Sequence, residues 1–398
     1  MKKLGQRILW QRASDYLRRY RPLIIGVAGS TGKTMTKDAI KLCLEENHLV
    51  RAADGSYNTP VGVALSLLGL TVQQAHRHWL RLLTRSRIKE MINEEPRLII
   101  LELGADQPGD IDFFARKLAF DIGVITNVQS THLRLFSSRD MVAHEMMSLA
   151  VDIPPDGHII LNADDELVKQ MAESLKANII FFGESGNTDV RLLRAERLNS
   201  HGFACEINVQ GTLHELHLPH LVARYQLSNV LAALAVVVAL EADIKTAFRR
   251  LPYLQPPPGR MRLLSGHAGS RILDDSYNAS PESTLLALQT LADIHAGRRI
   301  AILGDMLDLG LRSLPYHQQV GRLAAEVADI FVTVGDNMRA AGAAALKTDD
   351  TDVHHFQDSR YVGKWMTEFL HRDDLILVKG SRDMRMEEVV KRLIYSAS

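Results

Sequence analysis

One short segment constrains the fold of this chain more than any other: Leu23–Ile40, LIIGVAGSTGKTMTKDAI. The apolar run at its start predicts a buried strand, and the residues after the glycines predict a helix from about Thr34. Between them lies a glycine-bearing loop that ends in Lys-Thr. Glycines let backbone N–H groups turn toward a polyphosphate, and the positive end of the following helix adds to that attraction. The segment therefore predicts a strand–loop–helix unit that binds phosphate.

The candidate phosphate loop consists of six residues: Gly29, Ser30, Thr31, Gly32, Lys33 and Thr34. Lys33 can reach the β- and γ-phosphate oxygens of a nucleotide, and Thr34 can hold Mg²⁺. The longer form of this motif has a glycine at the position of Val27, so the chain satisfies only the shorter Gly-x-x-Gly-Lys-Thr pattern. The place of the loop between a buried strand and a helix favours a phosphate site over a chance match.

Apolar runs recur through the first part of the chain and end in Gly, Asn, Asp or Glu: LIIGVAG, RLIILELG, DIGVITNV, HIILNADD and NIIFFGE. Runs that are apolar throughout suit strands buried on both faces, and hence a parallel sheet covered by helices. In such sheets the ligand crevice lies beyond the carboxyl ends of the strands. We therefore expect the polar residues that close these runs to converge on one rim.

The chain divides at a stiff joint, LQPPPGRMRLL, over Leu254–Leu264. Before it, the alternating stretch from Asp189 to His217 predicts a small antiparallel addition. After it, the runs RILDDSYNAS, RRIAILGDM, DIFVTVGDN and DLILVKGSR alternate with helical stretches. The expected organisation is an N-terminal helix over 1–22, a phosphate-loop parallel-sheet domain over 23–256 and a smaller Rossmann-like α/β domain over 257–398.

Composition narrows the classes of function. The 47 Lys and Arg balance the 47 Asp and Glu, so nothing points to a nucleic-acid partner or to stable membrane insertion. Cys43 and Cys205 are too few for a disulfide framework or a metal cluster, which favours a reducing, cytoplasmic location. The longest apolar run, Val230–Leu240, is too short to span a bilayer and predicts a buried helix.

The first 22 residues carry charge but no continuous apolar stretch, so they do not resemble a signal peptide. Leu4, Ile8, Trp10 and Leu17 have roughly helical spacing. We expect a surface helix packed on the first domain; the alternative is a basic helix that binds a membrane surface or a partner.

Two residues of the central domain are candidate metal ligands. Glu102 closes RLIILELG, where a carboxylate can coordinate Mg²⁺ beside the phosphate loop; the alternative is a helix cap or a solvated loop acid. His132 follows VITNVQSTH, and a lone loop histidine is as readily explained by solvation.

The second domain carries its own candidates. Asp275 and Asn278, in DDSYNAS, can hold a ribose and a base, although such clusters are also ordinary turn composition. Arg260 can reach a phosphate across the crevice. Lys379 and Arg382, at the end of LVKGSR, suit a substrate carboxylate; a solvated basic loop is the alternative.

Ten segments in this order resemble the Mur ligase family, and within it the members that add D-alanyl-D-alanine to a muramyl tripeptide. They are GSTGKTMTKDAI, YNTPVGVALSLL, LELGADQPGDI, VITNVQSTHL, LNADD, SNVLAALA, PPPGRMRLL, LDDSYNASPES, ILGDMLDLG and LVKGSRDMRMEEVV. The resemblance implies ATP-dependent amide-bond formation in peptidoglycan precursor synthesis. A carboxylate takes the γ-phosphoryl group of ATP, and the amine of an amino acid or dipeptide then displaces phosphate.

The resemblance also implies the roles of the candidate residues. Lys33 and Thr34 bind phosphates and metal, and Glu102 and His132 are Mg²⁺ ligands. Arg260 and Asp275 grip the phosphates and ribose, Asn278 lies near the base, and Asn58, Lys379 and Arg382 contact substrate. The C-terminal domain is expected to close on the central one to assemble the site.

The chain departs from the family pattern in three places. Family members carry a further domain, which holds the UDP-sugar, before the phosphate loop; here 22 residues precede Leu23. We therefore expect that the nucleotide end of the substrate is held differently or by a partner, or that the substrate is not a UDP-sugar.

The second departure is Met146, in AHEMMSLA, where the family has a carbamylated lysine that binds a second Mg²⁺. A thioether is a poor ligand for Mg²⁺; on a helix His144 faces elsewhere and Glu145 is only slightly better placed, so we predict a single well-held Mg²⁺. The third is Ala223-Arg224-Tyr225-Gln226 in place of Gly-x-His-Asn, with Asn229 kept.

Two alternatives stay open at this level. One is a ligase of the same chemistry that acts on another carboxylate in a different pathway. The other is a nucleotide-binding homologue with weak catalysis that serves as a regulatory partner.

Overall fold

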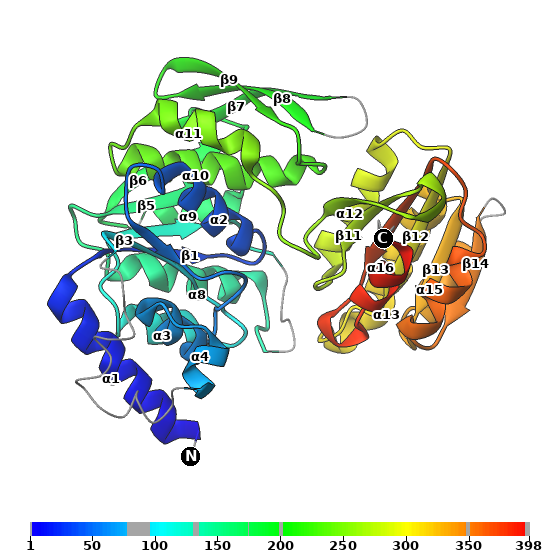
Figure 1. Cartoon of the computed structure of the whole chain (residues 1–398), viewed down its shortest axis with the longest axis horizontal. Helices are drawn as coiled ribbons and strands as arrows, with labels where there is room; N and C mark the ends of the chain where they lie inside the picture. The colour runs from blue at the N-terminus through cyan, green and yellow to red at the C-terminus, as the bar shows by residue number, and fades with distance from the viewer. Residues whose placement is uncertain are drawn as a thin grey trace.

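The computed structural model describes residues 2–77, 96–129, 135–173, 175–198, 202–347 and 351–394. Within these ranges the chain forms two α/β lobes, each built on its own sheet (Figure 1). The larger sheet has nine strands in the order β2-β3-β1-β4-β5-β6-β7-β8-β9, and the smaller has six in the order β10-β11-β15-β12-β13-β14. The predicted α/β fold class is confirmed.

The five apolar runs form the parallel core of the larger sheet. They are β1 (Leu23–Ala28), β3 (Leu98–Glu102), β4 (Ile122–Ile125), β5 (His158–Asn162) and β6 (Asn178–Gly183), with β2 (Val50–Ala52) at the edge. Their side chains divide between two core clusters, one on each face of the sheet. Burial on both faces is the reason that these strands read as apolar throughout.

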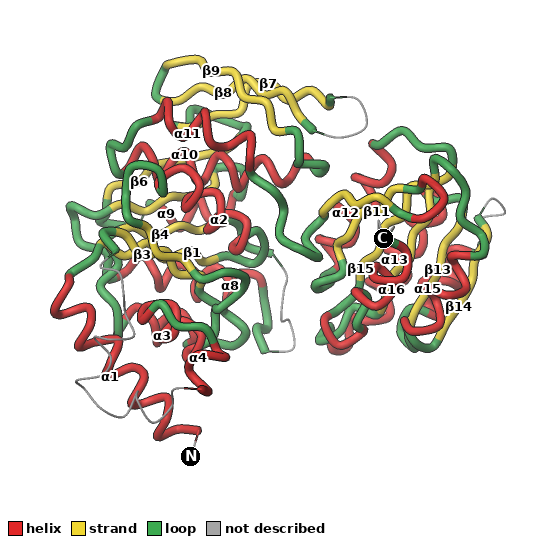
Figure 2. The backbone as a smooth tube through the Cα atoms, in the orientation of Figure 1, coloured by secondary structure: helices red, strands yellow, loops and turns green. Residues whose placement is uncertain are grey.

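Helices cover both faces of this sheet. On one face lie α2 (Lys33–Leu44), α10 (Leu227–Ala239) and α11 (Ile244–Arg250). On the other lie α3 (Pro60–Leu68), α7 (Asp110–Ala115), α8 (Arg139–Val151) and α9 (Glu166–Ala172), with the short α4 (Val72–Arg77) after α3. The predicted antiparallel addition is present as β7 (Val190–Arg197), β8 (Phe203–Val209) and β9 (Thr212–Leu218), which form one layer at the top of Figure 2.

The N-terminal segment forms α1 (Lys2–Tyr20), which lies against α3. Leu9, Trp10, Ala13 and Tyr16 are buried in the core cluster of that face, so the expected packing of a surface helix on the first domain is confirmed. No helix in the described ranges combines the length and apolarity that a bilayer crossing needs. The run Val230–Leu240 lies within the buried α10 and its C-terminal end, as its length predicted.

The smaller sheet pairs β10 (Arg262–Ser265) antiparallel with β11 (Arg271–Asp275). The other strands run parallel: β15 (Asp374–Lys379), β12 (Arg298–Gly304), β13 (Ile330–Val334) and β14 (Asp352–Phe356). One face carries α12 (Pro281–Asp293), α13 (Ser313–Val327) and α14 (Arg339–Ala345), and the other carries α15 (Ser359–Thr367) and α16 (Glu387–Leu393).

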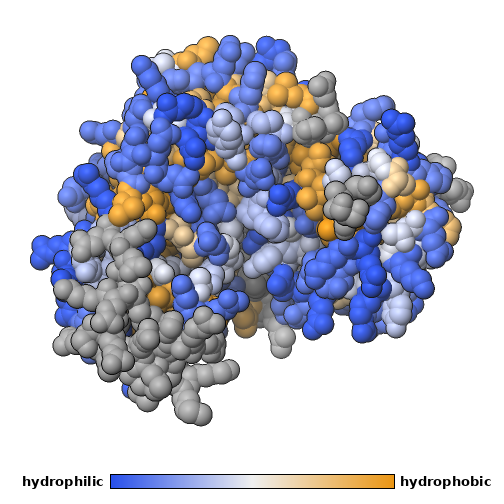
Figure 3. Space-filling model, viewed as in Figure 1, coloured by the Kyte–Doolittle hydropathy of each residue, from blue (hydrophilic) through white to orange (hydrophobic). Residues whose placement is uncertain are grey.

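Short 3₁₀ turns complete the described structure: η2 (Arg224–Gln226), η3 (Leu251–Tyr253), η4 (His267–Gly269), η5 (Gly310–Arg312) and η6 (Arg382–Met384). Val222 and Ala223, just before η2, are fully buried in the core cluster that contains Met261 and the inner faces of α12 and α13. The two lobes therefore share a packed contact. On the face shown in Figure 3, hydrophilic side chains cover most of both lobes, with smaller apolar patches among them.

Candidate active site

The two glycines of the phosphate loop are required by the local geometry. Gly29 and Gly32 have φ of 135° and 84°, which residues with a Cβ rarely adopt. A Cβ at Gly29 would lie 2.0 Å from Thr126 Oγ1, and one at Gly32 would lie 2.2 Å from Asn229 Oδ1. The loop thus passes so close to its neighbours that only glycine fits at either position.

The loop is held in place by the residues that follow β4. Thr31 donates from its backbone N–H and its hydroxyl to Asn127 Oδ1, at 3.1 and 3.2 Å. Thr126 donates its hydroxyl to the Thr31 carbonyl at 2.6 Å, and Ser30 N–H donates to the Asn127 carbonyl at 2.9 Å. The predicted convergence of strand ends on one rim is therefore confirmed here.

Lys33 lies inside this loop and donates to the carbonyls of Gly29 at 2.6 Å and Ser30 at 3.3 Å. Burial lowers the pKa of Lys33; the carboxylate of Glu102 opposes that change, and the charge of Arg260 adds to it. Arg260 belongs to the other lobe, so two cations act on each other across the cleft. A polyphosphate between them would stabilise the charged form of Lys33 and offset the repulsion.

Glu102 is only 4% exposed, and its two oxygens have different surroundings. Oε1 accepts hydrogen bonds from Ser56 Oγ at 2.6 Å and Asn58 Nδ2 at 3.3 Å. Oε2 has no hydrogen-bond partner among the described residues, and neither has the buried hydroxyl of Thr34. Buried oxygens without partners are unfavourable unless something binds them, and a hard cation such as Mg²⁺ takes oxygen ligands of this kind. The residues present fit a magnesium ion.

The structure places Asn58 beside Glu102, so its predicted contact with substrate remains a prediction. Ser56, which our sequence reasoning did not single out, is the shorter contact. The sequence feature that could have pointed to Ser56 is the stretch GSYNTP, in which polar residues precede the helix that begins at Pro60. His132 falls in 130–134, outside the described residues.

Lys37 is a second residue that sequence reasoning missed. It lies on α2, one turn after Lys33, and is 1% exposed. Its ammonium pairs with Asp38 at 3.0 Å and donates to the carbonyls of Ala53 and Gly55, the latter at 3.0 Å. Lys37 thereby fixes the segment that brings Ser56 and Asn58 to Glu102.

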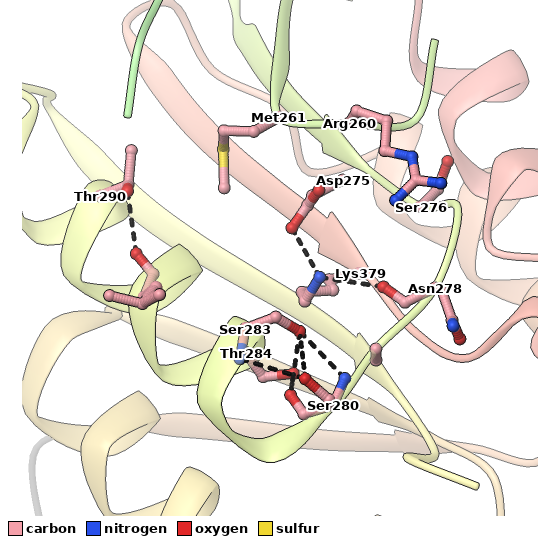
Figure 4. Close-up of polar contacts among 12 residues, drawn as sticks. Arg260, Met261, Asp275, Ser276, Asn278, Ser280, Ser283, Thr284, Thr290 and Lys379 are labelled. Carbon is pink, nitrogen blue, oxygen red and sulfur yellow. Dashed lines mark hydrogen bonds and ion pairs between the residues drawn. The ribbon is translucent and has the colours of Figure 1, made fainter. Parts of the chain in front are cut away.

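Lys379 and Asp275 form a buried ion pair in the C-terminal lobe. Lys379 Nζ lies 2.6 Å from Asp275 Oδ2 and donates to the Asn278 carbonyl at 2.9 Å (Figure 4). Burial raises the pKa of Asp275, and the ammonium of Lys379 opposes that change. Lys379 thus holds Asp275 and the Asn278 carbonyl, and its predicted contact with a substrate carboxylate remains a prediction.

Two arginines share the ring of Tyr277. The guanidinium carbon of Arg260 lies 3.9 Å from the ring centroid, and that of the exposed Arg382 lies 5.0 Å from it. Such cation–π contacts orient a guanidinium without neutralising it. Arg260 therefore keeps its charge available for an anion in the cleft.

A cleft of about 360 Å³ lies between the two lobes and is lined by residues of both. Its lining includes these predicted residues: Ser30, Thr31, Gly32, Thr34, Arg260, Asp275, Asn278 and Lys379. That volume is in the range of small-molecule sites. Tyr225, Gln226 and Asn229 also line it, which places the departure from Gly-x-His-Asn inside the cleft. Desolvation, with a contribution from Asp275, raises the pKa of Tyr225, so this residue presents a neutral hydroxyl.

The second departure lies in the core. Met146 is 1% exposed and belongs to the cluster beneath the sheet, with Val142 and Leu149. Glu145 is committed elsewhere: its carboxylate accepts from the N–H groups of Gly109 at 2.8 Å and Ile111 at 2.6 Å, at the start of α7. The predicted single Mg²⁺ remains a prediction.

Comparison with known proteins gives matches over both lobes. The family description "Mur ligase middle domain" matches residues 27–237, and "Mur ligase, glutamate ligase domain" matches residues 259–382. The UDP-N-acetylmuramoyl-tripeptide–D-alanyl-D-alanine ligase of Bacillus subtilis is 28% identical over 98% of this chain and 79% of its own. The enzyme of the same name from Escherichia coli is 28% identical over 93% of this chain and 76% of its own.

Solved structures agree. A MurF ligase from Thermotoga maritima in complex with ADP superposes with a TM-score of 0.82 at 25% identity, over 97% of this chain and 83% of its own. A folylpolyglutamate synthase from Mycobacterium tuberculosis, at 15% identity and a TM-score of 0.68, shares the fold. The middle-domain match alone covers more than half of the sequence. The chain therefore belongs to the Mur ligase family.

Proposed function

We propose that this protein is an ATP-dependent ligase that joins D-alanyl-D-alanine to a muramyl tripeptide in peptidoglycan precursor synthesis. The observation that carries the proposal is the cleft between the lobes, where the phosphate loop of one lobe meets Arg260 and Asp275 of the other. The substrate class and the reaction class both follow from the similarity to the ligases named above. We propose a cytoplasmic location, which the two free, buried cysteines favour.

In this proposal the phosphate loop holds the polyphosphate of ATP with its backbone N–H groups, while Lys33 and Arg260 offset its negative charge from opposite sides. Asp275 faces the ribose, and Asn278 lies near the base. Thr34, Glu102 and His132 would hold Mg²⁺. When bound, that ion would neutralise charge that develops on the transferred phosphoryl group.

The chemistry proceeds in two displacements. A carboxylate oxygen of the tripeptide bonds to the γ-phosphorus as the bond to ADP breaks, which gives an acyl phosphate. The dipeptide amine then attacks the acyl carbon, loses a proton to the surroundings, and inorganic phosphate leaves. The residues of the cleft position the reactants and exclude water rather than react covalently.

The test is phosphate release from ATP with purified protein, UDP-N-acetylmuramoyl-tripeptide and D-alanyl-D-alanine. We expect turnover only when all three substrates and Mg²⁺ are present, and about a thousandfold less with Lys33→Ala, because a transition-state charge contact is lost. Turnover with other carboxylates but not with the tripeptide would redirect the proposal to another acid. ATP binding without any turnover would contradict it.

A further inference from the structure

Gln226 uses every hydrogen-bonding position of its carboxamide. It is 1% exposed and stands where η2 meets α10. Its Oε1 accepts from the N–H groups of Val222 at 2.9 Å and Ala223 at 3.0 Å. Its Nε2 donates to the carbonyls of Arg260 at 3.3 Å and Met261 at 3.2 Å. A carboxamide has two donor hydrogens and an oxygen with two lone pairs, so this side chain is saturated.

The two acceptor carbonyls belong to the residue that faces the cleft and to the residue after it. Arg260 stands between Gly259 and Met261, which have φ of 73° and 56°. A positive φ is unfavourable for a residue with a Cβ such as Met261, so this backbone conformation depends on contacts from neighbouring residues. Asp274 Oδ2 supports it on one side by accepting from Gly259 N–H at 3.0 Å, and Gln226 supports it on the other.

The same glutamine connects to the phosphate loop. Asn229 donates from Nδ2 to the Gln226 carbonyl at 3.2 Å, and its Oδ1 accepts from the Thr36 hydroxyl at 3.0 Å. Thr36 is on α2, and Asn229 Oδ1 is the atom that Gly32 approaches. Hydrogen bonds thus connect the phosphate-loop helix to the Asn229 side chain, Asn229 to the backbone of Gln226, and the Gln226 side chain to the backbone of Arg260.

We propose that Gln226 is a positioning residue, which sets the place of Arg260 relative to the phosphate loop across the joint between the lobes. The inference rests on the proposed function, in which Arg260 acts on the phosphates of ATP. Glutamine suits the role because it supplies two donors and two acceptor positions at this reach. Asparagine is one methylene shorter, and glutamate replaces both donors with an oxygen that faces two carbonyls.

The test uses Gln226→Glu and Gln226→Asn in the full chain, with Gln255→Glu as a matched control. Gln255 lies on the same joint and is exposed, with Arg262 as its hydrogen-bond partner. We expect kcat to fall about tenfold or more in both Gln226 variants and to stay unchanged in the control, since a displaced Arg260 stabilises the transition state less.

A double-mutant cycle with Arg260→Ala separates positioning from a general structural effect. If Gln226 acts through Arg260, Gln226→Glu has little further effect on kcat in the Arg260→Ala background. Losses that multiply in full would overturn the proposal. Protonation restores one donor to the glutamate, so the deficit of Gln226→Glu, relative to wild type at the same pH, should shrink as the pH falls; a constant deficit would count against it.

Two further measurements do not depend on turnover. Amide hydrogen exchange over 259–263 should speed up in Gln226→Glu but not in Gln255→Glu, and unchanged exchange overturns the inference even if the ligase assay fails. ATP affinity should weaken in Gln226→Glu only when Arg260 is present. If wild-type protein binds ATP without turnover, the proposed function fails, whereas these two results still decide the role of Gln226.

Discussion

At the scale of single residues, some members of the site could be predicted from the sequence and others could not. Lys33, Thr34, Glu102 and Arg260 stand in recognisable patterns at strand ends and in the glycine loop, so their positions could be predicted. Lys37 could not, because its partners at 53–55 lie far enough along the chain that only the folded structure brings them together. The ion pair of Lys379 with Asp275 could not be predicted either, because nothing in LVKGSR discloses that partner.

Glu102→Gln should lower Mg²⁺-dependent kcat by about a hundredfold or more, because an amide is a weaker ligand for Mg²⁺ than a carboxylate. The Oε1 contacts with Ser56 and Asn58 tolerate an amide oxygen, so the thermal midpoint should change little. Steady-state kinetics over a range of Mg²⁺ concentrations would measure this. A variant with wild-type Mg²⁺ dependence would remove Glu102 from the metal site.

Lys37→Met should lower both stability and turnover, although Lys37 does not line the cleft. Two carbonyls lose their donor and Asp38 loses its counter-charge, which costs about 1–3 kcal/mol. Misplacement of Ser56 and Asn58 should reduce kcat by about 10–100-fold, as for other residues that orient metal ligands. Lys41→Met is the control, since Lys41 lies one turn further along α2 and is partly exposed. Equal kcat in the two variants would contradict the role of Lys37.

The burial of Met146 predicts one magnesium ion per chain in the complex with a non-hydrolysable ATP analogue and acid substrate. Met146 lies in an apolar core cluster, and Glu145 caps the start of α7. Equilibrium dialysis at saturating nucleotide would count the ions. Two tightly bound ions per chain would show that other groups replace the missing ligand.

At the scale of elements, the strands were the most predictable part of the molecule. Strands buried on both faces leave continuous apolar runs, and all five runs of the central lobe became parallel strands. The edge strands β2, β10 and β14 were not predicted, because half-buried edges lack that signal. The loop after β12 was recognised only as part of GDMLDLG. Its hydrogen bond with His317 could not be predicted from the sequence, because only the folded structure brings the two together.

His317 should make the stability of this loop depend on pH. It is fully buried on α13, donates from Nδ1 to the Ser313 carbonyl at 2.7 Å and accepts from Met306 N–H at 3.1 Å. Burial lowers its pKa. The unfolded chain therefore binds more protons just below the ordinary pKa of 6.5, so stability is complete above that pH and declines as the pH falls toward the lowered value.

Urea unfolding of wild type and His317→Gln, near neutrality and two pH units lower, measures the effect. The stability advantage of wild type should shrink by up to about 1.4 kcal/mol per pH unit in that window, because glutamine does not titrate there. His295→Gln, at an exposed position, should track wild type at both pH values. A constant gap between wild type and His317→Gln would show that the imidazole is not the titrating group.

At the scale of the whole molecule, a ligand in the cleft would contact both lobes and so stabilise them together. A nucleotide analogue with Mg²⁺ at a hundred times its Kd should raise the free energy of unfolding by about 2.7 kcal/mol. Because both lobes line the cleft, amide exchange should slow both around 29–36 and around 259–279. In Arg260→Ala, protection of the second region should be lost while the first keeps it. Protection of the first region alone in wild type would place the nucleotide on one lobe.

The burial of Val222 and Ala223 beneath α12 and α13 has a consequence for the independence of the two halves. Severing the chain at the three prolines would leave the C-terminal piece with a hole where two apolar side chains belong, and the other piece with those side chains in water. The hydrophobic core of the C-terminal lobe is therefore completed by residues of the central lobe. A movement of one half against the other must therefore either keep Val222 and Ala223 inside that core or expose both to water.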